Sequence, residues 1–211
     1  MDLYEVREGY ISESLNENEV ASSPIEQFKL WFGQAAVAKI YEPIAAVLAT
    51  ATKSGIPSAR VLLFKNFSEK GFDFFTNYES KKSKELNENP NAAIVFYWGE
   101  LERQVRIEGK VVKLSSEESD NYFETRPVGS RLGAWASPQS KIIDHREWLE
   151  KQHEEFRSKF KHGEIPRPNQ WGGFRLVPVM VEFWQGRQNR LHDRIQYYLE
   201  SNVWKIRRLA P

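Results

Sequence analysis

Residues 44–76, IAAVLATATKSGIPSARVLLFKNFSEKGFDFFT, decide the fold. Three runs of apolar, β-branched and aromatic residues are separated here by two short turns that contain glycine. Runs of this length and composition between such turns are typical of strands joined as hairpins. The stretch therefore predicts an antiparallel meander with strands at 44–52, 58–67 and 72–76.

The segments on either side add more strands and a few helices. Ser23, followed by proline and then by Glu26, forms a capping-box pattern with proline at the first helical position. Because few helices separate the strands, a barrel or sandwich is favoured over a parallel sheet. We predict a mainly β fold with flanking helices, of the α+β class. The other expected elements are helices at 24–40, 80–90, 116–125 and 137–163, the last with room for a break, strands at 92–98, 104–114 and 172–184, and a hairpin of 194–198 with 203–209.

The chain fits a single domain preceded by an arm. Residues 1–22 are polar and acidic with little periodicity, so we predict a flexible N-terminal arm there and one domain over 23–211. A chain of 211 residues is long enough to bury a sizeable core. No internal repeat or linker-like tract divides it.

Composition argues against several functional classes. The net charge of +1 and pI of about 7.9 disfavour a nucleic-acid module, although basic and aromatic residues are interleaved. Cysteine is absent and the four histidines are scattered, so no metal site is predicted. Neither a dinucleotide fingerprint nor a phosphate-binding loop occurs. Without a secretory signal or an apolar run of membrane-spanning length, a cytoplasmic location with no membrane partner is expected.

A period-two pattern of cationic groups closes the segment 182–194, EFWQGRQNRLHDR. In extended backbone, Arg190, His192 and Arg194 project to one side. Such a face suits an anionic ligand. An edge strand with a solvated charged face explains this segment equally well.

Other basic residues lie at the ends of predicted elements. Arg60 and Lys65 bracket four apolar residues, and Lys81-Lys82 open a helix whose first turn offers free amides to an anion. Arg126 and Arg131 flank Gly129-Ser130. A solvated face or a core ion pair explains each pair taken singly, whereas their joint occurrence favours a phosphorylated ligand.

Seven blocks, in order along the chain, closely resemble the pyridoxine (pyridoxamine) 5'-phosphate oxidase family. The final residues 208–211, RLAP, are also similar to the family's ending. The blocks are 60–65 (RVLLFK), 75–82 (FTNYESKK), 101–105 (LERQV), 122–127 (YFETRP), 133–140 (GAWASPQS), 171–175 (WGGFR) and 182–194.

This resemblance implies an FMN-binding split β-barrel that forms a homodimer with two flavin sites at its interface. The implied activity is oxidation of pyridoxine or pyridoxamine 5'-phosphate to pyridoxal 5'-phosphate, with hydride transfer to FMN and reoxidation by O2 giving H2O2. Two alternatives stay open: another split-barrel flavoprotein such as a flavin reductase, or a non-catalytic carrier of pyridoxal 5'-phosphate. The residues that the resemblance assigns to FMN, some of them from the second subunit, are Arg60, Val61, Leu62, Leu63, Phe64, Lys65, Phe75, Thr76, Lys81, Lys82, Gln104, Gln139, Ser140, Trp184 and Arg194.

The resemblance assigns a second set of residues to the substrate. Lys65, Tyr122, Arg126 and Ser130 would meet the substrate phosphate. Arg190 and His192 would cover the pyridine ring as the catalytic pair, and Arg7 with Tyr10 would form a lid. The sequence departs from the family at Phe75, where tyrosine is common, and at Lys81, where arginine is common. The arm also lacks the glycine pair that often follows the lid tyrosine.

Overall fold

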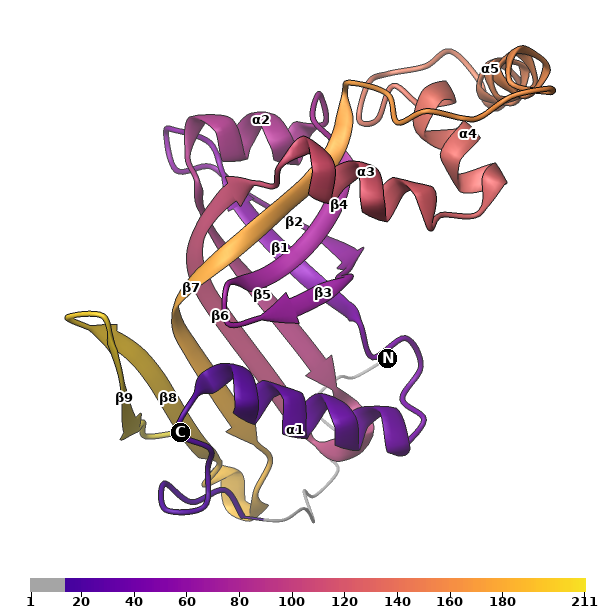
Figure 1. Ribbon diagram of the computed structural model, residues 1–211. Coiled ribbons are helices and arrows are strands. Elements are labelled where there is room, and N and C mark those ends of the chain that lie inside the picture. Colours follow the sequence, from indigo (N-terminus) through magenta and orange to yellow (C-terminus); the bar gives the residue numbers. More distant parts are fainter. Residues whose placement is uncertain (1–13) are drawn as a thin grey trace, which may run out of the picture.

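The computed structural model describes residues 14–211, in which nine strands form one antiparallel sheet. Along the sheet the order is β2-β1-β5-β6-β7-β4-β3, and β8 and β9 extend from β7 (Figure 1). The strands are β1 Ala45–Ala51, β2 Pro57–Leu63, β3 Asn66–Ser68, β4 Gly71–Asn77, β5 Asn91–Trp98, β6 Arg103–Lys113, β7 Trp171–Gln185, β8 Asp193–Glu200 and β9 Val203–Arg208.

The 15-residue strand β7 organises the sheet. It pairs with β6 along most of its length, with β4 through its first half and with β8 through its second half. A register shift between Glu108 and Gly109 bends β6 against it. Only glycine fits at position 109, because a Cβ atom there would lie 2.0 Å from the carbonyl oxygen of Val177. The curved sheet confirms the predicted mainly β split barrel.

The continuous meander predicted from residues 44–76 is wrong in its pairing. The run 58–67 breaks into β2 and β3, which lie at opposite ends of the strand order. At the break, the Phe64 amide donates to the Ile44 carbonyl, and the next amide, of Lys65, donates to the Asp73 carbonyl. The chain thus leaves β1 and joins β4 within two residues. Hydrophobic alternation sets which face of a strand is buried but not which strand lies beside it.

Five helices flank the described sheet, and α1 lies across one end of it (Figure 1). At the start of α1, the Ser23 hydroxyl accepts from the Ile25 amide, so Ser23 is the N-cap as expected, although the bond goes to the second helical residue and not to Glu26 as a capping box requires. Ser80 stands at the N-cap of α2, but its hydroxyl makes no capping bond there. The helices are α1 Pro24–Val37, α2 Lys81–Glu88, α3 Ser116–Glu124, α4 Val128–Ala136 and α5 Arg146–Lys159, with 3-10 turns η1 Gly99–Leu101 and η2 Gln188–Arg190.

The predicted helix 137–163 is wrong in its first third. Ser137 is extended and ends α4, and α5 begins only after His145, whose Nδ1 accepts from the Trp148 amide. The pair Ser137-Pro138 has the residue types of a helix start, although no helix begins there. Helix α4 was not predicted, because its two glycines lower its helix propensity.

Aromatic side chains fill the space between α1 and the sheet. The Phe28 ring lies within 5.0 Å, centroid to centroid, of the rings of Phe67, Phe72 and Phe96. A second, smaller cluster of Phe123, Ala134 and Trp171 lies under α3 and α4. The main core thus extends from α1 through the sheet to Leu86 of α2, and the small cluster supports the part of the molecule where α4 and α5 project (Figure 1).

Residues 14–22 of the predicted arm carry specific contacts. Arg208 binds both carboxylate oxygens of Glu17 and the carbonyl of Leu15, and the Leu15 amide donates to Asp193 at 3.1 Å. The Tyr197 hydroxyl donates to the Ala21 carbonyl at 2.6 Å. This segment therefore lies along β8 and β9. Arg7 and Tyr10 lie outside the described residues, so their lid role stays a prediction.

Candidate active site

A cleft of about 400 Å³ opens where the end of β2, β4, α3, α4 and the start of β7 meet. Nine residues assigned from the sequence line it, and Thr125, Pro127 and Trp171 line it as well although they were not assigned. Trp171 opens one of the family-like blocks, and that was the only available signal for it. The nine are Leu62, Leu63, Lys65, Phe75, Thr76, Tyr122, Arg126, Ser130 and Gln139.

Three nearly parallel aromatic rings form one wall of the cleft. Phe75 and Tyr122 stack with centroids 3.9 Å apart, and Trp171 lies 5.7 Å from Phe75 at an interplanar angle of 13°. Arg167 fixes the start of β7, because it donates to the Trp171 carbonyl at 2.7 Å and pairs with Asp120 at 2.6 Å. The wall therefore has a set orientation that suits a planar ligand.

Arg126 lies over this wall without an acidic partner among the described residues. Its guanidinium carbon is 4.5 Å from the centroid of the Trp171 ring. Its Nη1 is buried and makes no hydrogen bond within residues 14–211, and burial lowers the pKa of Arg126. The group still stays protonated near neutral pH. A buried, unsatisfied donor on a cation is costly unless an anion meets it.

Lys82 supplies a second cation behind the cleft. Its Nζ lies 3.1 Å from the Thr76 hydroxyl and 3.0 Å from the Gln139 side-chain oxygen, while that oxygen also accepts from Thr76. Burial, and then the nearby charge of Arg60, lower the pKa of Lys82 to about 8. Lys82, Thr76 and Gln139 come from three separate segments, so these contacts join α2, β4 and the stretch after α4.

Arg60 and Lys81 lie beside Lys82 but share a carboxylate, Glu85. The remaining members of the assigned run differ in exposure. Phe64 is buried in the main core and Val61 is exposed, so these side chains lie outside the cleft lining. Ser140 is exposed with a φ of 69°.

The other assigned residues gather at the far end of β6, β7 and β8. Gln104 is opposite Trp184, which is in turn opposite Arg194. The idea that Arg190, His192 and Arg194 share one extended face is wrong for Arg190, which ends η2 with a φ of 62°. Between residues 186 and 194, only Asp193 and Arg194 belong to a strand, at the start of β8. Asn189 and Arg190 both adopt left-handed backbone, which breaks the period of two.

His192 is held in one orientation. Its ring lies 4.6 Å from that of Trp184, and its Nδ1 accepts from the Arg187 amide at 3.1 Å. A nitrogen that accepts carries no proton, so the neutral ring bears its N–H on Nε2. Burial, and then the charge of Arg190, lower the pKa of His192 from its usual 6.5. The imidazole is therefore neutral near pH 7.

Arg194 is anchored at the same end of the sheet. Its Nε donates to Glu182 at 2.8 Å and its Nη1 to the Ala210 carbonyl at 2.8 Å. Glu182 is buried and also pairs with Arg106, at 3.2 Å. Because Glu182 is a buried acid between two cations, it fixes the direction of Arg194. This role of Glu182 was missed because nothing in the sequence separates it from other strand residues.

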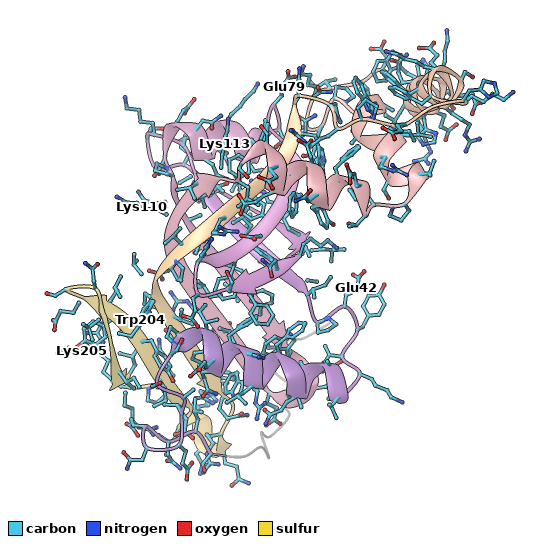
Figure 2. All side chains as sticks on the ribbon, in the orientation of Figure 1. Glu42, Glu79, Lys110, Lys113, Trp204 and Lys205 are labelled. Carbon is cyan, nitrogen blue, oxygen red and sulfur yellow. The ribbon has the colours of Figure 1, made fainter. Side chains whose placement is uncertain are left out.

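The cleft and this second group lie far apart in one protomer. Trp171 opens β7 and Trp184 lies near its end, about 40 Å away along the strand at roughly 3.3 Å per residue. In Figure 1, β7 runs from the end of the sheet beside α3 and α4 to the opposite end, and in Figure 2 Glu79, just before α2, marks the first of these ends. One copy of the chain does not bring both groups to the same ligand.

The fold and the cleft define a split-barrel protein whose site combines stacked aromatic rings with buried cations. Residues 32–160 match the family described as pyridoxamine 5'-phosphate oxidase, and residues 171–211 match the pyridoxine 5'-phosphate oxidase C-terminal dimerisation region. The chain belongs to the pyridoxamine 5'-phosphate oxidase family, a family of enzymes.

Individual relatives agree with this placement. The pyridoxine/pyridoxamine 5'-phosphate oxidase of Trichormus variabilis is 55% identical over 98% of this chain and 97% of its own, and that of Cupriavidus pinatubonensis is 54% identical over 99% of both. Among solved structures, PhzG from Burkholderia lata, in complex with tetrahydrophenazine-1-carboxylic acid, has a TM-score of 0.90 at 35% identity, covering 95% of this chain and 99% of its own. A pyridoxamine 5'-phosphate oxidase-related, FMN-binding protein from Nostoc punctiforme shares the fold, with a TM-score of 0.71 at 20% identity over 91% of this chain and 100% of its own.

No helix within residues 14–211 is both long and apolar enough to cross a membrane.

Proposed function

We propose that this protein oxidises pyridoxine 5'-phosphate or pyridoxamine 5'-phosphate to pyridoxal 5'-phosphate with FMN as cofactor. The observation that carries the proposal is the buried Nη1 of Arg126, which has no hydrogen-bond partner within residues 14–211 and lies beside a stacked aromatic wall. A phosphate on a planar ring satisfies both features at once. Names of relatives that match along the whole chain support the same substrate class.

The cleft residues would divide the work of binding. Arg126, Lys65, Tyr122 and Ser130 would hold the substrate phosphate, whose remote binding energy orients the ring. Lys82 would hold the FMN phosphate with Arg60 and Lys81, and it fits because its present partners are neutral oxygens. FMN, when bound, supplies the hydride acceptor, and O2 restores its oxidised form with release of H2O2.

The residues at the far end of β7 would complete the site from a second subunit. This follows from the length of β7, which separates Arg190 and His192 from the cleft of their own protomer. Several apolar side chains of β1, β2 and β5 stay exposed and would be covered in a homodimer. They are Val47, Val61, Leu63 and Tyr97.

The buried Nη1 of Arg126 favours this activity over a flavin reductase, which requires the flavin contacts but not an arginine at a separate phosphate position. A carrier of pyridoxal 5'-phosphate differs in requiring no flavin. An absorbance spectrum of the purified protein, followed by anaerobic addition of pyridoxamine 5'-phosphate, tests the proposal. A flavin band that bleaches supports it, a colourless protein that binds pyridoxal 5'-phosphate supports the carrier, and a flavin band that does not bleach supports the reductase.

Lys82 makes FMN binding depend on pH. The pKa of Lys82 is about 8 in the free protein, so its amine is mostly neutral above that pH. If the phosphate needs the charged amine, Lys82 must then take up a proton when FMN binds. We expect the affinity for FMN to fall as the pH rises above about 8, and Lys82→Ala to weaken binding by about 1.5–3 kcal/mol and remove this dependence. Fluorescence titration of FMN measures both, with the exposed Lys84→Ala of the same helix as control. Equal affinities for wild type and Lys82→Ala would contradict the role.

His192 sets a second pH dependence. Its lowered pKa keeps Nδ1 free to accept from Arg187, so the neutral ring persists to a lower pH than an ordinary histidine allows. We expect the rate of anaerobic flavin reduction, at saturating substrate, to stay constant on acidification and to fall only below the usual 6.5. The variant His192→Asn should be slower throughout and lack that fall. A rate that falls as the pH rises, and not on acidification, would show that the imidazolium is the working form.

A further inference from the structure

Glu85 is a buried carboxylate within the cluster of cations that we assign to the FMN phosphate. Its exposed fraction is 4%, and it lies on α2 against β1 and β2 (Figure 1). One oxygen accepts from Lys81 at 2.6 Å. The other accepts from the hydroxyls of Thr50, at 2.5 Å, and Ser58, at 2.6 Å, and lies 3.4 Å from Arg60. Burial opposes its charge, but the hydrogen bonds from Lys81, Ser58 and Thr50 outweigh burial and lower the pKa of Glu85 to about 2.

Glu85 binds two of the three cations. The guanidinium of Arg60 donates to Glu85, to the Leu48 carbonyl and to the hydroxyls of Thr50 and Ser58. Lys81 is paired with Glu85 in an i,i+4 contact. Lys82 alone of the three has only neutral hydrogen-bond partners in the described chain. With Glu85 ionised and all three cations protonated, the cluster carries a net charge of +2, equal and opposite to a phosphate dianion.

We propose that Glu85 is a built-in counter-anion, which stabilises the empty cation cluster and thereby limits how tightly the cluster holds the phosphate of FMN. The inference rests on the FMN site proposed above. Three cations crowded without Glu85 would repel one another, so the acid favours the folded protein before the cofactor arrives. The same charge repels an incoming phosphate and competes with it for Arg60 and Lys81.

The two effects have opposite signs, which separates this role from simple packing. A residue that only maintained the shape of the site would lower both stability and affinity when altered. Loss of the negative charge alone should lower the stability of the apoprotein and raise the affinity for the phosphate-bearing cofactor. Riboflavin, which has the same ring system without the phosphate, should not respond.

The test compares Glu85→Gln with Glu88→Gln, which removes the same charge from an exposed position on the same helix. In Glu85→Gln we expect the apoprotein melting temperature to fall by about 5 °C or more and the Kd for FMN to fall about three- to tenfold. The Kd for riboflavin should stay within about twofold of wild type, since the ring contacts are unchanged. Glu88→Gln should match wild type in all three measurements.

Several results would decide against the proposal. An unchanged or weaker FMN affinity in Glu85→Gln would make Glu85 a structural residue only, and an equal gain for riboflavin would place its influence outside the phosphate. If Glu85→Gln folds only with FMN present, dilution of the holoprotein gives the Kd. A wild-type protein that binds no FMN would instead refute the proposed function, so the two failures are distinguishable.

Discussion

Replacing Arg126 with methionine is expected to raise the KM for pyridoxamine 5'-phosphate by about two to three orders of magnitude. This is the effect expected when about two charge-assisted hydrogen bonds to the phosphate are lost. The methionine keeps an unbranched stem beside Trp171, so the aromatic wall should stay in place. Arg126 makes no ion pair in the described structure, and folding should not suffer from its removal. The FMN content should therefore equal that of wild type. Steady-state kinetics and the flavin spectrum measure the two quantities.

Unphosphorylated pyridoxamine provides the sharper control. Without a phosphate it gains nothing from Arg126, so wild type and variant should oxidise it equally slowly. Arg146→Met, on the exposed face of α5, removes the same charge away from the cleft and should leave the KM unchanged. A normal KM in Arg126→Met, or an equal loss with pyridoxamine, would mean that the half-buried guanidinium serves the fold or the flavin instead of the substrate phosphate.

The local elements of the fold were predictable, whereas the pairing of the strands was not. Strand β5 and helix α3 lie within one residue of the predicted ranges 92–98 and 116–125, because a local sequence pattern depends on neighbours a few residues away. The break at Phe64-Lys65 depends on hydrogen bonds to Ile44 and Asp73. Which partners these amides meet depends on the curvature of the whole sheet. The hydrophobic pattern of a single strand carries no information about that curvature.

The candidate site divides in a similar way. Arg126 and Lys82 stood out as cations at the ends of predicted elements, and partial or full burial is what distinguishes them in the structure. Glu85 was overlooked because a glutamate four residues after a lysine is typical of a solvated helical pair. The alternation proposed for Arg190 failed because its φ of 62° has no signature in the residue types around it. The roles of the assigned residues stay predictions.

Replacing Arg190 with methionine is expected to slow anaerobic flavin reduction by about a hundredfold or more while the protein stays folded and yellow. Arg190 is exposed in one protomer and lies outside the core, so a neutral side chain of similar length should not affect stability. Only the reductive half-reaction involves the substrate ring, so reoxidation by O2 should keep its normal rate. Stopped-flow absorbance follows each half-reaction separately. A colourless variant would mean that Arg190 contacts the flavin. A normal rate of flavin reduction would mean that Arg190 does not act on the substrate.

The same variant tests how the two groups of residues meet. If each site takes Arg126 from one subunit and Arg190 from the other, a heterodimer of Arg126→Met with Arg190→Met has one fully normal site and one doubly altered site. Coexpression with two different tags and purification on both isolates this heterodimer, and sedimentation verifies that it is a dimer. Because one of two sites is intact, it should show about half of the wild-type activity, although each variant alone is nearly inactive. If both residues served a site within one chain, every site in the heterodimer would carry one substitution and activity would stay near zero. The length of β7, which holds the cleft and η2 apart in a single protomer, favours the first outcome.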